Sequence, residues 1–240
     1  MNSWLILQFH PTNPGFWIVV SLLAWLPIKL VEGRCSPRQL RWMNLARWVL
    51  IPYAGLLAGS LSPQLMGLTG IDWRVTFGVG IVLAVGLIAL LAAVRVSLHS
   101  AKETVAEDAK SEKWQIEPRR DRGWPDSAIA ILMAGVEQFQ WSFLRGAVWE
   151  IMLLRQVGIE PVEYWAVWIA ALIALPEILL QPLNLADRTI KTAILAMTAV
   201  LFIFTQSFWL CWALHASAWL LLTTMPGAAG KDPSTSASSG

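Results

Sequence analysis

The stretch AGVEQFQWSFLRGAVWE, from Ala134 to Glu150, decides the fold because it places charges inside a long apolar run. Its central charged residues are Glu137 and Arg145. A charged side chain at the depth of a bilayer costs at least about 2.5 to 3.5 kcal/mol, so such residues are rarely without a role. The surrounding apolar residues predict a membrane-spanning helix, and any functional interpretation must account for these two charges.

The whole chain has the composition of a polytopic membrane protein. Of its 240 residues, 56% are hydrophobic and 14% are charged, whereas a soluble domain is about 25% charged. The 15 tryptophans agree with this class, because the indole ring favours the membrane interface. A net charge of +2 is too small to imply nucleic acid as a partner, and Cys35 and Cys211 form neither a disulfide framework nor a metal-ligand pair. We expect the lipid bilayer as a partner and no cofactor or metal.

Apolar segments recur at the length of about 20 residues that a bilayer crossing requires. The predicted fold is an all-α polytopic transmembrane helix bundle of about seven spans, within a range of six to eight. It forms one domain over 1–225, with a charged cytoplasmic loop over 95–126 and a disordered tail over 226–240. The first expected span is 15–28, and it continues to 31 if Lys29 extends its amine to the interface. The second is 48–61, with a start nearer 42 as the alternative. The others are 75–94, 127–154, 164–180, and two within 190–222 separated at Thr205-Gln206-Ser207.

The cations lie mainly on one side of this topology. With the N-terminus outside, 15 of the 18 Lys and Arg residues fall in inner segments, among them Arg47 and Lys191. Arg74 and Arg155 fall in outer segments, and Arg145 stays within the bundle. The positive-inside rule therefore predicts an outer N-terminus and a cytoplasmic C-terminus.

Several polar residues of different spans are predicted to share one internal layer. At 1.5 Å of rise per residue, Arg145 and His215 lie roughly 12 to 14 Å below the outer edge, with Glu137, Gln140 and Glu177 near the same layer. We expect a polar centre in which Arg145 pairs with Glu137, Glu177 or both. The alternatives are an Arg145 that extends to the outer surface, a Glu177 that faces the inner headgroups, and a His215 with a structural hydrogen bond.

Two stretches resemble the CPBP family, the CAAX-processing and bacteriocin-processing intramembrane proteases. WSFLRGAVWEIMLLRQVG (Trp141–Gly158) is similar to its first signature region, where Glu-Glu-x-x-x-Arg-Gly starts a long apolar helix. SFWLCWALHASAWLL (Ser207–Leu221) is similar to the last region, which carries His-x-x-x-Asn. The link SPQLMGLTGIDWRVTFGVG resembles a segment that precedes a helix in the family. The resemblance covers about 55 to 225 and implies a bacterial plasma-membrane protein.

The chain differs from the family at most of the motif positions that hold the family's catalytic residues. An Arg-Gly pair and the final histidine match, but glutamine and tryptophan stand where the two catalytic glutamates are expected, and a tryptophan replaces the final asparagine. The middle Phe-x-x-x-His motif, expected near 173–181, has no histidine. The residues that fall on motif positions are Gln140, Trp141, Arg145, Gly146, His215 and Trp219.

These departures favour a protein without the family's activity. Glutamine and tryptophan cannot act as a general base, and His215 alone cannot hold a catalytic zinc, which takes about three protein ligands. We expect a non-catalytic homologue that binds a membrane partner or a ligand. One alternative is an active but atypical intramembrane endopeptidase that cleaves a peptide substrate with Glu137, Glu177 and His215 as catalytic residues. Another is an accessory subunit of a larger membrane complex.

Overall fold

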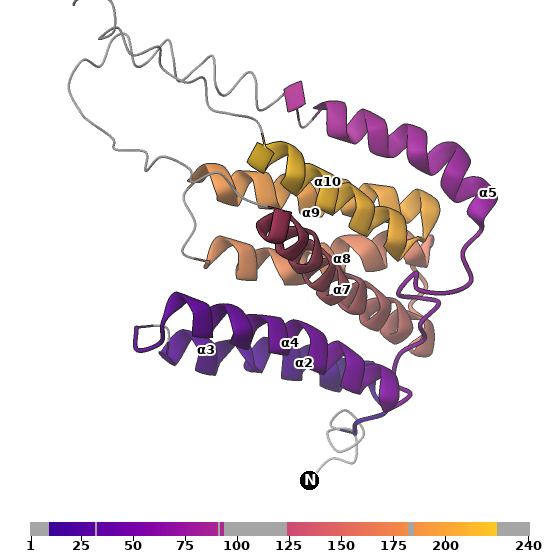
Figure 1. The fold of residues 1–240 in the computed structure, drawn as a ribbon. Helices are drawn as coiled ribbons and strands as arrows, with labels where there is room; N and C mark the ends of the chain where they lie inside the picture. The colour runs from indigo at the N-terminus through magenta and orange to yellow at the C-terminus, as the bar shows by residue number, and fades with distance from the viewer. Residues whose placement is uncertain (1–9, 32, 91, 94–123, 182–184, 225–240) are drawn as a thin grey trace, which may run out of the picture.

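The computed structural model describes residues 10–31, 33–90, 92–93, 124–181 and 185–224, and these residues form helices and connecting turns without a strand. The predicted disordered tail and almost all of the predicted charged loop lie outside them. The helices run back and forth along one common direction (Figure 1). They are α2 (Pro14–Leu23), α3 (Trp25–Val31), α4 (Pro37–Leu57), α5 (Trp73–Val75), the π-helical turn η1 (Thr76–Gly80), α7 (Trp124–Leu154), α8 (Val162–Leu179), α9 (Leu185–Thr205) and α10 (Phe208–Thr224). From η1 an apolar helix continues to Leu90.

Local sequence signals set several helix ends. The Asn13 side chain accepts a hydrogen bond from the Gly15 backbone and caps α2. Ser36 and Gln39 form a reciprocal capping box that begins α4, which satisfies backbone N–H groups that have no partner in the first turn. Gln206 adopts a left-handed φ of 46°, and this conformation separates α9 from α10 at the break that the sequence predicted.

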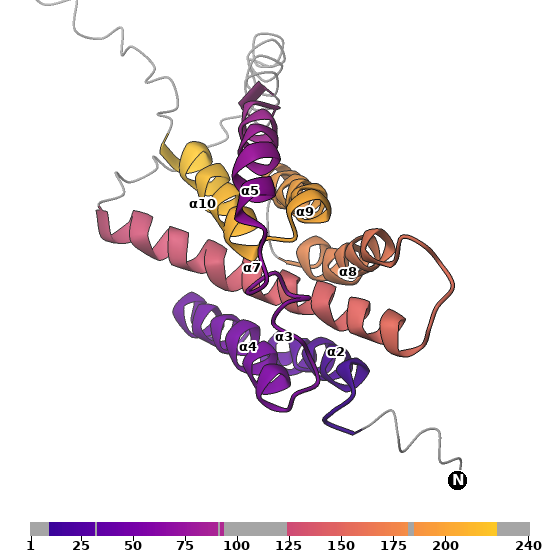
Figure 2. The same cartoon turned by 90° about the vertical axis from the view of Figure 1, so that its right-hand side faces the viewer.

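Helix α7 lies at the centre of the bundle. It contacts α2 and α4 on one side and α8 and α10 on the other, and Figure 2 shows it crossing between these two groups. The helix labelled α5 lies on the outside, beside α9 and α10 (Figure 2). Glu137, Gln140 and Arg145 of α7 each meet a side chain from a helix far away in the sequence.

The link between α4 and α5 packs into this bundle through two glycines. The Met66 side chain is fully buried, and a Cβ on Gly146 of α7 would lie 2.8 Å from Met66 Cγ. Gly67 has a φ of 74°, and its carbonyl accepts a hydrogen bond from Phe208 N at 2.9 Å. The link thus joins the centre of α7 to the turn between α9 and α10.

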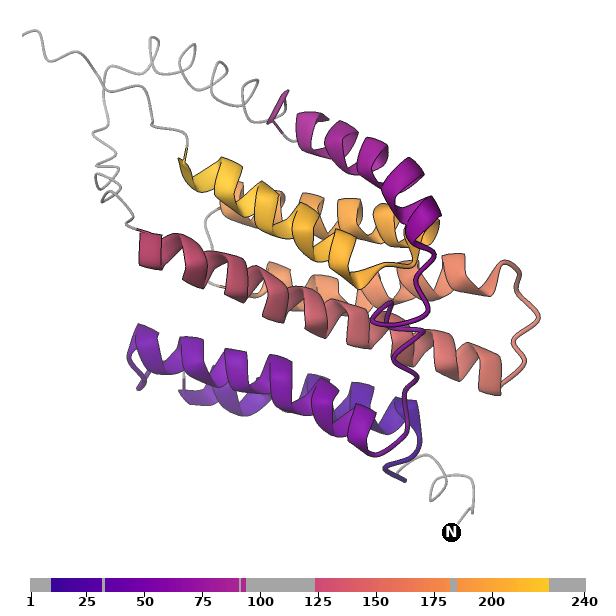
Figure 3. The same ribbon diagram turned by 45° about the vertical axis from the view of Figure 1, so that its right-hand side comes forward.

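Three helical segments among the described residues are long and apolar enough to cross a membrane: Pro14–Val31, Val162–Leu179 and Asp187–Thr205. This is fewer than the seven spans expected from the sequence. The helix ends alternate between the two ends of the bundle (Figure 3). At one end α3, α8 and α10 finish and α4, α7 and α9 begin, while at the other α4, α7 and α9 finish and α5, α8 and α10 begin.

Candidate functional site

The inward faces of α7 carry a row of polar side chains. Those that are buried against neighbouring helices are Glu137, Gln138, Gln140, Ser142 and Arg145. A buried polar group without a partner costs about 1 to 3 kcal/mol, so the partners of these residues define what the centre can do.

Glu137 is held by a cation from α9. Its Oε1 atom accepts a hydrogen bond from Lys191 Nζ at 2.8 Å, and Lys191 also donates to Gln181 Oε1 at 3.1 Å. The other carboxylate oxygen, Oε2, lies 3.8 Å from Nε2 of His215 on α10, which is beyond hydrogen-bonding distance. The structure therefore brings together Glu137 and His215, as the sequence predicted, and adds a lysine that the prediction placed in an inner segment.

Trp141 covers the His215 imidazole. The two rings stack with centroids 4.9 Å apart and an interplanar angle of 9°. His215 is fully buried, and neither of its ring nitrogens has a hydrogen-bond partner among the described residues. The described residues therefore supply no partner for the alternative of a structurally hydrogen-bonded histidine, and a flat aromatic contact covers this face of the ring.

Glu177 belongs to a second ion pair. Its carboxylate pairs with Arg47 of α4 and accepts a hydrogen bond from Trp48 Nε1 at 2.8 Å. Arg47 also donates to the Ser21 carbonyl at 3.2 Å, and Gln140 Nε2 donates to Ser21 Oγ at 2.7 Å. This network joins α2 and α4 to α7 and α8. Arg47 thus lies within the helix bundle, not in an inner loop as the sequence prediction had it.

Arg145 differs from both of these cations because the described residues contain no carboxylate that pairs with it. Its Nη2 atom donates to Thr198 Oγ1 at 3.2 Å, and its guanidinium carbon lies 5.0 Å from the centroid of the Phe202 ring. Nη1 has no hydrogen-bond partner in the described part of the chain, and the side chain is only 1% exposed. The predicted pairing with Glu137 or Glu177 is wrong because those acids are occupied by Lys191 and Arg47, and the alternative of an extension to the outer surface is wrong as well.

Two further motif positions are Gly146 and Trp219. Gly146 admits Met66 against α7, and Trp219 is partly buried on α10. Among the described residues, no three His, Cys, Asp or Glu side chains gather in a way that could hold a metal ion.

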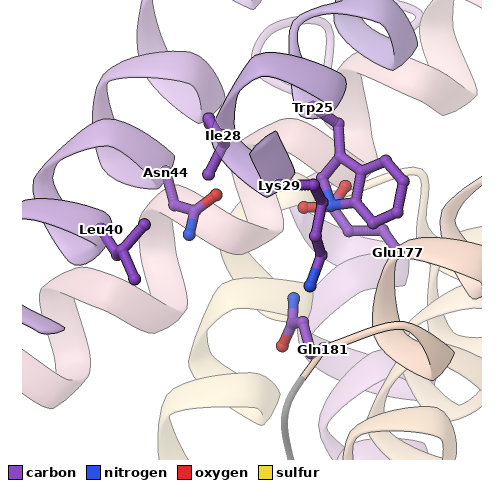
Figure 4. A pocket seen from close by; sticks show the side chains of 7 residues that line it. All are labelled: Trp25, Ile28, Lys29, Leu40, Asn44, Glu177 and Gln181. Atoms are coloured by element: carbon purple, nitrogen blue, oxygen red, sulfur yellow. The ribbon is translucent and has the colours of Figure 1, made fainter. Parts of the chain in front are cut away.

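A small cavity of about 40 Å³ lies between α3, α4 and the end of α8. Its lining includes Lys29, Asn44, Glu177 and Gln181, as Figure 4 shows. At 10 to 15 Å³ for each water, this volume suits about three water molecules. Glu137 and His215 do not line it, so this cavity does not connect all three predicted catalytic residues around one space.

Sequence reasoning missed three partners of the centre, namely Arg47, Lys191 and Thr198. Lys191 and Thr198 both belong to the apolar run that begins at Ile190. They are seven positions apart, two helical turns, and with Ile194 and Leu195 they form one face of α9. The helical period therefore indicates that Lys191 shares a face with Thr198, but the positive-inside rule had assigned Lys191 to an inner segment.

No protein-family model, curated protein or solved structure matches the chain.

Proposed function

We propose that the protein is a non-catalytic integral membrane protein whose polar centre stabilises the bundle and binds a ligand or a membrane segment of a partner. The observation that carries the proposal is the stack of Trp141 on His215, next to a Glu137 that Lys191 already holds. A carboxylate in an ion pair and an imidazole covered by an indole leave little room for an activated water. General base catalysis requires such a water within hydrogen-bonding reach.

The proposal includes a scaffold like that of the CPBP proteases. Two contacts support it: Trp141 meets His215, and Gly146 meets the Met66 segment. Both join the stretches that carry the resemblance. Trp141 occupies the motif position of a catalytic glutamate, so its contact with His215 supports a family site whose acid has been replaced by an apolar ring.

We further propose a polytopic arrangement of about seven spans with a cytoplasmic C-terminus in a bacterial plasma membrane. The alternation of helix ends supports an odd number of crossings (Figure 3). Lys29 and Arg34 lie in and after α3, and Arg188 lies in the first turn of α9, so they belong to the end where α10 finishes. Arg74 of α5 and Arg155 after α7 belong to the other end. The greater number of cations at the first end favours it as the cytoplasmic side.

The decisive experiment is a cleavage assay with purified protein in lipid nanodiscs and a library of membrane-spanning peptides. We expect no cleavage by the wild type. Cleavage that Glu137→Ala abolishes, while the exposed-site variant Glu160→Gln retains it, would contradict the proposal.

That outcome would establish the alternative function of an atypical intramembrane endopeptidase. The observation in its favour is the 3.8 Å separation between the Glu137 carboxylate and His215 Nε2, a distance that one bridging water or a small side-chain movement closes. In this alternative Glu137 and His215 act together, and Glu177, which is bound to Arg47, has a structural role.

A further inference from the structure

The buried cations of the bundle differ in whether a carboxylate pairs with them. Lys191 has Glu137 as a carboxylate partner, and Arg47 has Glu177. Arg145 is buried more completely than either and forms no ion pair among the described residues. An uncompensated charge in a low-dielectric interior is strongly unfavourable, so the guanidinium requires a source of negative charge.

Several buried hydrogen-bonding atoms of α7 and α10 lack a partner within the described part of the chain. These atoms are Arg145 Nη1, both amide atoms of Gln138, the Ser142 hydroxyl and the two His215 ring nitrogens. Each of the four side chains is at most 1% exposed. Native proteins leave few buried polar atoms unpaired, and a bound ion or an ordered water commonly satisfies those that no protein group reaches.

The helical period places these groups on one side of α7. Gln138, Ser142 and Arg145 are spaced i, i+4 and i+7, so they form a single stripe. Arg145 contacts Thr198 and Phe202 of α9, and Cys211 Sγ of α10 lies 3.4 Å from the Thr198 carbonyl oxygen. The stripe therefore faces the junction of α7, α9 and α10.

We propose that this stripe binds one small monovalent anion, a halide or a carboxylate, between the Arg145 guanidinium, the Ser142 hydroxyl and the Gln138 amide. The charges support an anion over a cation. The Lys191 ammonium neutralises Glu137, and the acidic group that interacts with Arg145 is the Cys211 thiol, which as a thiol carries no charge. Arg145 therefore leaves the centre with one net positive charge. Because the four side chains are almost completely buried, the ligand must be small. This inference rests on the proposed function in one respect, that the centre binds and does not hydrolyse.

The test uses the full-length protein in nanodiscs, with thermal unfolding measured in sodium chloride, sodium formate and sodium gluconate at equal ionic strength. Chloride represents a halide and formate a carboxylate, whereas gluconate is too large for the site. At 100 times the dissociation constant, a specific anion raises the melting temperature by roughly 5 to 10 °C. Which salt gives the shift distinguishes the two anion classes.

The variants Ser142→Ala and Gln138→Leu remove neutral lining groups and keep Arg145, so they avoid the risk that a variant of Arg145 fails to fold. We expect each to reduce the shift by at least half, whereas Ser217→Ala, on the opposite side of α10 from His215, keeps it.

Equilibrium dialysis with labelled formate or chloride should give about one bound anion per chain. Equal melting temperatures in all three salts, or shifts that both variants retain in full, would overturn the proposal. Peptide cleavage is measured in a separate assay. A failure of the anion proposal can therefore be distinguished from a failure of the proposed non-catalytic function.

Discussion

At the scale of the residue, the bundle is defined by charges that find partners across long distances in the chain. Arg47 and Glu177 are separated by 130 positions, and Glu137 and Lys191 by 54. A buried ion pair contributes little net stability relative to apolar side chains, but the loss of one member leaves the other charge buried and alone. The pairs therefore specify which helices associate.

The Arg47–Glu177 pair gives the first prediction. Arg47→Met should destabilise the protein by about 1 to 3 kcal/mol, because the partly buried Glu177 carboxylate loses its cation and keeps only Trp48 Nε1 as a hydrogen-bond donor among the described residues. The exchange of both charges, Arg47→Glu with Glu177→Arg, should recover part of this loss. The measurement is reversible unfolding in mixed detergent micelles.

Two further variants complete this test. Glu160→Gln, at an exposed position, should change the free energy of unfolding by less than about 0.5 kcal/mol. The exchange of Arg145→Glu with Glu177→Arg involves two residues that do not pair, so it should not restore the free energy of unfolding. If that second exchange restored stability and the first did not, the assignment of partners would be wrong.

Trp141 gives a second prediction at the same scale. Trp141→Ala removes the ring that stacks on His215 and should cost about 3 to 5 kcal/mol through the cavity that it leaves. Trp141→Phe keeps an aromatic face and should cost less. The His215 ring signal in an NMR spectrum of a His10→Gln, His99→Gln background should shift in both variants, because ring stacking determines its chemical environment. An unchanged signal would show that the two rings are not in contact.

At the scale of the element, the sequence predicted the helical class and the extents of α7 and α8, but not the start of α4. That helix begins at Pro37, within the segment expected to be a basic loop. The break at Gln206 and the extents of α7 and α8 followed from apolar length and from residues that end helices. Arg47 and Lys191 were misplaced because an isolated count of charges assigns any cation near a helix start to the aqueous edge. The helical period shows that Lys191 shares a face of α9 with Thr198, but only the contacts between helices show which carboxylate each cation meets.

The link after α4 shows how close packing depends on glycine, and it gives a third prediction. A Cβ at Gly67 would lie 2.6 Å from the Gln206 carbonyl, whereas a Cβ at Gly59 would meet nothing within 4 Å. Both residues have a positive φ, so alanine at either position carries a backbone cost of about 1 to 2 kcal/mol.

Gly67→Ala should therefore be destabilised by more than Gly59→Ala, and the difference measures the packing of the link against the α9–α10 turn. Thermal unfolding of both variants in the same detergent gives this difference. Equal losses would mean that the turn moves aside at no cost.

At the scale of the whole molecule, the two ends of the bundle differ in charge, and this gives a fourth prediction. Cys35 is partly exposed between α3 and α4, whereas Cys211 is buried. A membrane-impermeant maleimide should label Cys35 in inverted vesicles and not in intact spheroplasts. In a Cys35→Ser, Cys211→Ala background, Glu160→Cys lies at the other end and should show the opposite pattern. Labelling of both positions from one side would contradict an orientation in which these two ends face different compartments.

The separation of the paired charges along the chain also constrains how the protein is made. Arg47 is synthesised long before Glu177, and Glu137 before Lys191. In the proposed membrane arrangement, each of these helices enters the bilayer with an unpaired charge, and the pairs form only when the later helices arrive. A nascent chain that stops after α7 would hold Arg47 and Glu137 without either partner. Such a truncated product should be retained by the insertion machinery or degraded, whereas the N-terminal half supplied together with a separate C-terminal half should assemble.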